Sequence, residues 1–163
     1  MKKILLPVIL VGLILLTACS TALPMGESEL SPAPQFVVED LQGNHVDVAA
    51  GQALVLNFWA SWCPSCRRMM PAWQTIYDEL GGDVRMMSIN VGESRDRAMQ
   101  FTSGAGHTFP VYLDAPLASA ADAFALTHFP TTIFINAHGD VLHRHIGTLN
   151  ATMLRLHTAD LLD

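Results

Sequence analysis

The sequence predicts an α/β fold in which helices flank a central mixed, mostly parallel β-sheet, with an added N-terminal β-hairpin. Residues 53–58 are a mostly apolar run, as expected for a strand buried on both faces. Residues 64–80 have helical spacing and stop at Gly81-Gly82, which is typical of a helix C-terminus. Strand and helix patterns then alternate, which indicates parallel strands joined by helices. The 163 residues suffice for one such domain with additional sequence before it.

The first residues have the pattern of a secretory signal peptide. Lys2 and Lys3 precede an apolar run at residues 4–16, which is short for a membrane span. Residues 16–19, Leu-Thr-Ala-Cys, resemble the lipobox of bacterial lipoproteins. The resemblance implies a signal peptide at residues 1–18 and a lipidated Cys19; ordinary cleavage or a simple anchor, with Cys19 incidental, are the alternatives. Each places the remaining chain in the bacterial cell envelope, facing the periplasm or the extracellular side.

The folded part is expected to begin after a short tether. Residues 19–33 are interpreted as the lipidated cysteine and a flexible polar linker, and residues 34–163 as one domain. Strands at 36–38 and 46–48 flank Gly43-Asn44 and predict a hairpin. After the buried strand and first helix, further strands are expected at 84–91, 111–113, 131–136 and 141–146. Further helices are expected at 94–103, with Ser94 as N-cap, at 117–126 and at 151–162.

Cys63 and Cys66 form a Cys-Pro-Ser-Cys motif between the buried strand and the first helix. A C-x-x-C pair beside a βαβ pattern is typical of redox-active cysteines. The free N–H groups and dipole of a helix N-terminus favour a thiolate at Cys63, and Cys66 lies on the same helix face. We expect Cys63 to attack a substrate disulfide and Cys66 to resolve the mixed disulfide. One alternative is an inert disulfide, which would stabilise the fold little because it closes so short a loop. The other is a zinc half-site, for which the sequence lacks a second cysteine pair.

Two segments around this motif resemble a known family. Residues 57–66, Asn-Phe-Trp-Ala-Ser-Trp-Cys-Pro-Ser-Cys, are similar to the active-site segment of thioredoxin-like proteins, in particular the TlpA/ResA-like branch. Residues 129–136, Phe-Pro-Thr-Thr-Ile-Phe-Ile-Asn, resemble the cis-proline strand of that branch, and Pro71 matches a proline that kinks its active-site helix. The resemblance runs from about residue 33 to the C-terminus. It implies a thioredoxin-like fold and thiol-disulfide oxidoreductase activity.

The resemblance also implies which residues contact the substrate. Pro130 is expected to be a cis-proline beside the cysteines, with a trans-proline at a strand start as the alternative. Phe129 and Thr131 flank it, and this segment would offer its backbone to an extended client strand. Trp62 and Pro64 would complete the docking surface around Cys63.

The chain departs from the family where an acid is usual. Asn57 stands in place of a buried aspartate, and Met69 stands where ResA-like proteins place a glutamate. Neither side chain can accept the proton of a thiol. Glu93 is the remaining acid near a predicted strand end, so it is a candidate proton relay; the alternative is a surface acid at a helix N-terminus. The Pro64-Ser65 dipeptide is also atypical, which leaves the direction of electron flow open.

The expected function is reduction of disulfides in periplasmic or cell-surface client proteins, with apocytochromes c, peroxidases or methionine sulfoxide reductases as candidate clients. Electrons would come from a membrane thiol donor, and the lipid anchor would hold the domain near it. No flavin, haem or nicotinamide motif is present in the sequence, so the redox-active disulfide is expected to be the only cofactor. The alternatives are a dithiol oxidase that donates disulfides and a copper-binding chaperone using Cys63, Cys66 and a histidine.

Charge and histidine placement favour neither nucleic acid nor metal. The net charge is −6 and no basic face is apparent, so nucleic acid is not an expected partner. His143 and His145 share a face of a predicted strand, which we interpret as the polar outer face of an edge strand rather than a metal site. The methionine pairs at 69–70 and 86–87 are expected to pack in the core.

Overall fold

The computed structural model describes residues 31–48, 51–114 and 119–162. Its strands are β1 (Ser31–Pro32), β2 (Val37–Asp40), β3 (His45–Asp47), β4 (Leu54–Trp59), β5 (Arg85–Asn90), β6 (Val111–Asp114), β7 (Thr131–Ile135) and β8 (Asp140–Ile146). Its helices are α1 (Pro64–Leu80), α2 (Arg95–Gly104), α3 (Ala120–Ala123) and α4 (Ala151–Ala159). The expected signal peptide and Cys19 lie outside the described residues.

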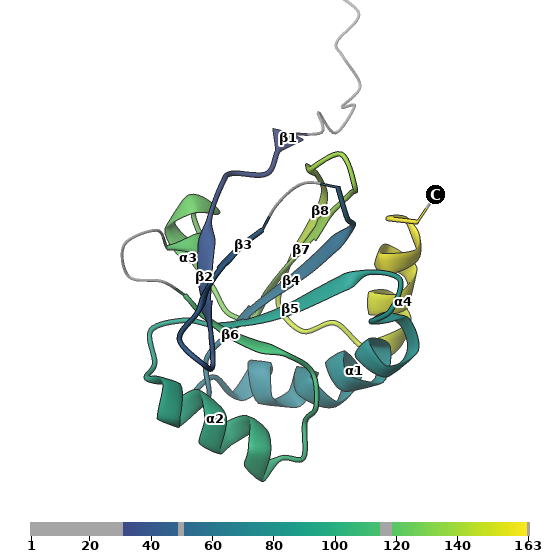
Figure 1. Cartoon of the computed structure of the whole chain (residues 1–163). Helices are drawn as coiled ribbons and strands as arrows, with labels where there is room; N and C mark the ends of the chain where they lie inside the picture. Colours follow the sequence, from purple (N-terminus) through teal and green to yellow (C-terminus); the bar gives the residue numbers. More distant parts are fainter. Residues whose placement is uncertain (1–30, 49–50, 115–118, 163) are drawn as a thin grey trace, which may run out of the picture.

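The strands form one sheet in the order β1-β8-β7-β4-β5-β6-β2-β3 (Figure 1). Among the described strands, only β4 with β5 and β5 with β6 pair in parallel. The other pairs are antiparallel. The prediction of a mixed sheet flanked by helices is therefore confirmed, but the expectation that the sheet is mostly parallel is wrong. The β2–β3 and β7–β8 hairpins account for two of the five antiparallel pairs, because a short turn joins only antiparallel strands. The other three pairs, β1–β8, β2–β6 and β4–β7, join strands that are distant in the sequence.

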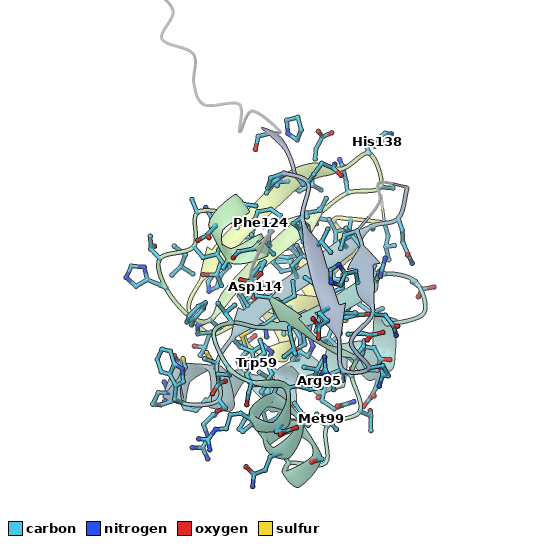
Figure 2. All side chains as sticks on the ribbon, turned by 60° about the vertical axis from the view of Figure 1, so that its left-hand side comes forward. Trp59, Arg95, Met99, Asp114, Phe124 and His138 are labelled. Carbon is cyan, nitrogen blue, oxygen red and sulfur yellow. The ribbon has the colours of Figure 1, made fainter. Side chains whose placement is uncertain are left out.

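Two apolar clusters lie on the two faces of this sheet, because alternate residues of β4 belong to different clusters: Val55 and Trp59 to the first, Leu56 and Phe58 to the second. The first contains Trp73 of α1, Ala98 of α2 and Leu154 of α4. The second contains the α3 segment and the N-terminal hairpin. Trp59 and Phe124, both labelled in Figure 2, belong to the first and the second cluster respectively. The paired methionines at 69–70 and 86–87 are buried, as the sequence predicted.

The boundaries differ from the sequence expectation at three places. Ser31 and Pro32, expected in the tether, pair with β8, and the Ala33 N–H donates to the Gly139 carbonyl at 2.8 Å. The helix expected at 117–126 ends at Ala123, and its expected first residues lie outside the described ranges. Ala125 then adopts a left-handed φ of 46°, a conformation that does not continue a helix. Helix α4 ends at Ala159, three residues earlier than expected.

The sheet has two distinct ends. Strand β4 runs for six residues, with Leu54 opposite Ile135 of β7 and Phe58 opposite Thr131. β1 pairs with the first residues of β8, at the Leu54 end. The loop after Trp59 therefore lies at the opposite end, about 20 Å away at ~3.3 Å per residue. Within residues 31–48, 51–114 and 119–162, no helix combines the length and apolar character that a membrane crossing requires.

Candidate active site

Cys63 is the N-cap residue of α1, immediately after the loop that leaves β4. Its backbone is extended, with φ −83° and ψ 113°, and Pro64 occupies the first turn, where a missing N–H costs nothing. The Cys66 N–H donates to the Cys63 sulfur at 3.3 Å. This is the capping contact that a Ser or Asp oxygen makes in other helices, so the sulfur directly receives a free helix N–H.

The surroundings of Cys63 favour its thiolate. Burial raises the pKa of this thiol, but hydrogen bonds from Cys66 and from Ser65 lower it, and the net result is a pKa below the ordinary value. The Ser65 hydroxyl lies 3.1 Å from the Cys63 sulfur. A thiolate is the nucleophile in disulfide exchange, so this environment suits the role that the sequence predicts for Cys63.

Cys66 lies in a different environment, although both cysteines are free thiols. Burial raises the pKa of the Cys66 thiol to about 12, and the hydrogen bond to Cys63 acts in the same direction. Cys66, in the first turn of α1, is fully buried, whereas Cys63 is 5 % exposed. The Cys66 thiol is therefore shielded and protonated at neutral pH, which suits the resolving role that the sequence predicts.

The Phe129-Pro130 segment faces the two cysteines. The Phe129–Pro130 bond is cis, as the family resemblance implied. The Cys63 thiol donates to the Phe129 carbonyl at 3.7 Å, and the Ser65 hydroxyl donates to the same oxygen at 3.4 Å. The segment expected to bind a client strand is thus in direct contact with the reactive sulfur.

The expected docking residues differ in their accessibility. Trp62 is 64 % exposed and its ring lies edge-on to that of Phe129, with 6.2 Å between centroids. Pro64 is also exposed, beside Cys63. Thr131 is buried, and its hydroxyl donates to the His128 carbonyl at 2.7 Å. Trp62, Pro64 and Phe129 therefore form the accessible rim, and the Thr131 side chain faces the protein rather than a client.

Glu93 is buried against the loop that carries the motif. Its carboxylate accepts hydrogen bonds from the Ser61 N–H and hydroxyl, both at 2.6 Å, and from the Asn90 amide at 2.7 Å. Arg97 approaches it at 3.8 Å, and only 8 % of the Glu93 side chain is exposed. The alternative of a surface acid is therefore wrong. Burial raises the pKa of Glu93, but the bonds from Asn90 and Ser61 and the charge of Arg97 lower it, so the net pKa lies below its ordinary value.

Ser61 and Asn90 are site residues that no motif in the sequence identifies. Ser61 lies 32 positions before Glu93 in the sequence, so only the fold brings the two together. Asn57 and Met69 are both buried, and Asn57 lies beside Ser88 and Thr132 on the neighbouring strands. These positions offer no carboxylate to the cysteines.

The described residues contain no cluster of three or more His, Cys, Asp or Glu side chains suited to a metal ion. The sequence predicted that His143 lies on the polar outer face of an edge strand. In the structure this face is covered at His143. Its ring stacks on His157 of α4, with 4.1 Å between centroids, and contacts Phe134. This arrangement packs β8 against α4.

Comparisons with known proteins agree with this geometry. The Redoxin family model matches residues 29–161. Thiol-disulfide oxidoreductase ResA of Halalkalibacterium halodurans is 34 % identical over 125 residues, which cover 75 % of this chain and 70 % of the relative. ResA of Bacillus subtilis is 35 % identical over 130 residues, covering 78 % and 72 % respectively.

A solved structure shows the same fold. A thiol:disulfide interchange protein of the thioredoxin family from Chlorobium tepidum TLS superposes with a TM-score of 0.73 at 24 % identity. The match covers 85 % of this chain and all of that one. At this identity the likeness concerns the fold, which is thioredoxin-like.

Proposed function

The chain belongs to the Redoxin family and is a thiol-disulfide oxidoreductase, and we propose that it works as a reductant of client-protein disulfides outside the cytoplasm. The observation that carries the proposal is the difference between its two thiols. Cys63 has a lowered pKa and touches the cis-proline segment, whereas Cys66 is buried with a pKa of about 12.

The chemistry transfers two electrons to the client. The Cys63 thiolate attacks one sulfur of the client disulfide, and the other client sulfur leaves as a thiolate. Cys66 then loses its proton and attacks the Cys63 sulfur, which releases the second client sulfur and leaves a Cys63–Cys66 disulfide. A dithiol donor must afterwards return two electrons. We assign that role to a membrane thiol protein, and apocytochromes c or oxidised enzymes remain the candidate clients.

The redox potential tests the direction. Purified protein is equilibrated with glutathione buffers, and the Cys63–Cys66 state is measured by acid quenching and mass-tagged alkylation. We expect a potential below about −200 mV and a mostly reduced pair in cells. A potential near −120 mV with an oxidised pair would establish the dithiol oxidase alternative instead. Stoichiometric Cu(I) binding weakened by a His→Ala change would establish the copper chaperone.

We also propose that Cys19 anchors the protein to the envelope through lipid. The fold supports this arrangement, because β1 enters the sheet at the end opposite the cysteines. A tether that joins at Ser31 would leave the surface around Cys63 free for client proteins and for the membrane thiol donor. We expect Cys19→Ser to abolish labelling by radioactive fatty acid and to move the protein into the soluble envelope fraction. Cys63→Ser is the matched control and should stay labelled and membrane-bound; labelled Cys19→Ser protein would contradict the proposal.

We propose Glu93 as a relay for the Cys66 proton. Its contacts with Ser61 and Asn90 favour a second role, in which it positions the loop before Cys63. Its carboxylate already accepts three hydrogen bonds and has a lowered pKa. Both features make it a weak proton acceptor near neutral pH.

A further inference from the structure

A cleft with two arginines in its lining opens near the reactive cysteine. It has a volume of about 210 Å³ and is lined by Ser61, Arg67, Arg97, Gln100 and Phe101. Ser61 lies two residues before Cys63, and the Arg67 N–H donates to the Cys63 carbonyl at 3.2 Å. The backbone of Arg67 therefore lies about one helical turn, ~5.4 Å, from that of Cys63.

Helix α2 provides the opposite wall. Arg97, Gln100 and Phe101 are spaced three and four residues apart, so they share one face of the helix. Figure 2 shows α2 at the lower end of the molecule, with Met99 labelled on it, far from the β7–β8 turn that carries His138. The α2 wall thus stands at the same end of the sheet as the cysteines.

The two arginines differ in their charge partners, because Arg97 is paired with the Glu93 carboxylate whereas Arg67 is not. The Arg97 Nε donates to the Ser61 hydroxyl at 3.1 Å and lies 3.8 Å from the Glu93 carboxylate. That carboxylate is already bonded to Ser61 and Asn90. The Arg67 guanidinium lies over the Phe101 ring, 5.8 Å from its centroid. Among the ion pairs of the described residues, none involves Arg67.

The charge of the cleft contrasts with that of the chain. The whole protein carries a net charge of −6, yet the rim beside Cys63 presents two guanidinium groups in one cleft. Guanidinium groups bind carboxylates through paired hydrogen bonds, and this geometry suits a single acidic group. Small-molecule sites usually exceed ~300 Å³, so a cleft of about 210 Å³ fits one side chain better than a whole ligand.

We propose that this cleft binds a carboxylate of the client protein, carried by an Asp or Glu close in sequence to the client's disulfide. The inference rests on the proposed function, since it names the class of client that the reductase prefers. An extended chain advances ~3.3 Å per residue, so an acid about two residues from the attacked cysteine would reach Arg67 and Arg97 while its sulfur lies at Cys63.

The test uses a pair of synthetic peptides that each contain one internal disulfide. They differ only in an Asp or an Asn two residues from a cysteine, and the rate constant for reduction by the reduced protein is measured for both. The added charge also changes the reactivity of the peptide cysteine itself. The decisive quantity is therefore the change in the Asp-to-Asn rate ratio between wild-type protein and its variants.

We expect Arg67→Gln to lower this ratio about threefold, and Arg67→Gln with Arg97→Gln to lower it about tenfold. The wild-type ratio should also fall as salt is raised from ~0.01 to ~1 M. Arg68→Gln is the matched control, because Arg68 is the exposed neighbour of Arg67 and does not line the cleft. It should leave the ratio unchanged. Arg67→Glu, at an exposed position, should reverse the preference in favour of a Lys-containing peptide.

The outcomes separate the inference from the function on which it rests. An unchanged ratio in Arg67→Gln, or an equal fall in Arg68→Gln, overturns the carboxylate cleft while the reductase function stands. Failure to reduce either peptide overturns both. Oxidised glutathione is included as a small carboxylate-bearing disulfide. If Arg67→Gln slows only the Asp peptide, the carboxylate comes from a protein client; if it also slows glutathione reduction, the cleft accepts small anions as well.

Discussion

At the scale of single residues, Ser65 connects the reactive sulfur with the substrate-binding segment. Its hydroxyl lies 3.1 Å from the Cys63 sulfur and 3.4 Å from the Phe129 carbonyl. A hydroxyl has one proton to donate, so it can serve only one of these acceptors at a time. When Cys63 is a thiol, its own proton can go to the Phe129 carbonyl. When Cys63 is a thiolate, the Ser65 proton is best donated to the sulfur, which carries the charge.

We therefore expect Ser65→Ala to raise the pKa of Cys63 and to slow its alkylation at pH 7 by up to about fivefold, the equivalent of a hydrogen bond of ~1 kcal/mol. The measurement is the pH dependence of iodoacetamide labelling of Cys63 in reduced protein. Ser65→Thr keeps the hydroxyl and is the control, with near wild-type labelling expected. Unchanged labelling in Ser65→Ala would show that the Cys66 N–H alone stabilises the thiolate.

At the scale of secondary-structure elements, Glu93 joins two loops that leave the same end of the sheet. Ser61 belongs to the β4–α1 loop, and Glu93 follows β5 just before α2. The carboxylate bonds to the backbone and the side chain of Ser61, and Asn90 at the end of β5 orients it. Ser94 then caps α2 through the Arg97 N–H at 3.3 Å, as the sequence predicted. The position of the Cys63 loop thus depends on the β5–α2 connection.

We expect Glu93→Gln to lower the free energy of unfolding by about 1–3 kcal/mol, because the new amide N–H₂ would face donors of Ser61 or Asn90. Urea denaturation of the reduced protein measures this loss. Glu79→Gln is the control, since Glu79 forms an exposed ion pair with Arg155 and its change should cost below about 1 kcal/mol.

The same variant decides whether Glu93 also relays a proton. If it only positions the loop, the rate at which Cys66 resolves a mixed disulfide should keep the shape of its pH profile. Loss of a titrating group from that profile, at unchanged stability, would establish the relay instead.

At the scale of the whole molecule, α4 contacts β8 of the sheet through a pair of stacked histidines. His143 stacks on His157, and Phe134 lies against both rings. Burial lowers the pKa of His143, the charges of His157 and His145 act in the same direction, and Asp160 opposes them, so the net pKa is below 6.5. Folding thus disfavours the protonated form of this side chain. The contribution of His143 to stability is intact above pH 6.5 and is lost as the pH falls through 6.5 and then through the lower pKa of the folded state.

We therefore expect the urea concentration at the unfolding midpoint of the wild-type protein to decrease as the pH is lowered from about 7.5 to about 5. His143→Phe should flatten this dependence while keeping an aromatic ring against Phe134. The cysteines are held reduced throughout. His138→Gln is the control, because His138 projects from the β7–β8 turn, where Figure 2 labels it, and should leave the pH dependence unchanged. A pH dependence that His143→Phe leaves intact would assign the effect to other groups.

The sequence by itself determined the fold class, the extent of α1 and the two reactive cysteines. These features are local: helical spacing, a glycine stop and a four-residue motif are all contained in one stretch of chain. The family resemblance added the cis bond before Pro130, which the structure confirms. The local strand and helix patterns could not give the balance of parallel and antiparallel pairs, because that balance depends on which distant segments pair in the sheet.

The tertiary structure alone decided which side chains surround the cysteines. Three contacts form only when distant segments pack together. They are the hydrogen bond between Ser61 and Glu93, the cation–π contact of Arg67 with Phe101, and the stacking of His143 on His157. The acidity and charge of these side chains follow from that packing, since burial and neighbouring groups, rather than residue type, set a pKa. Sequence spacing therefore predicted the two cysteines of the site and a thiolate at Cys63, whereas only the fold decided the burial of Cys66 and Glu93 and the cleft that Arg67 and Arg97 line.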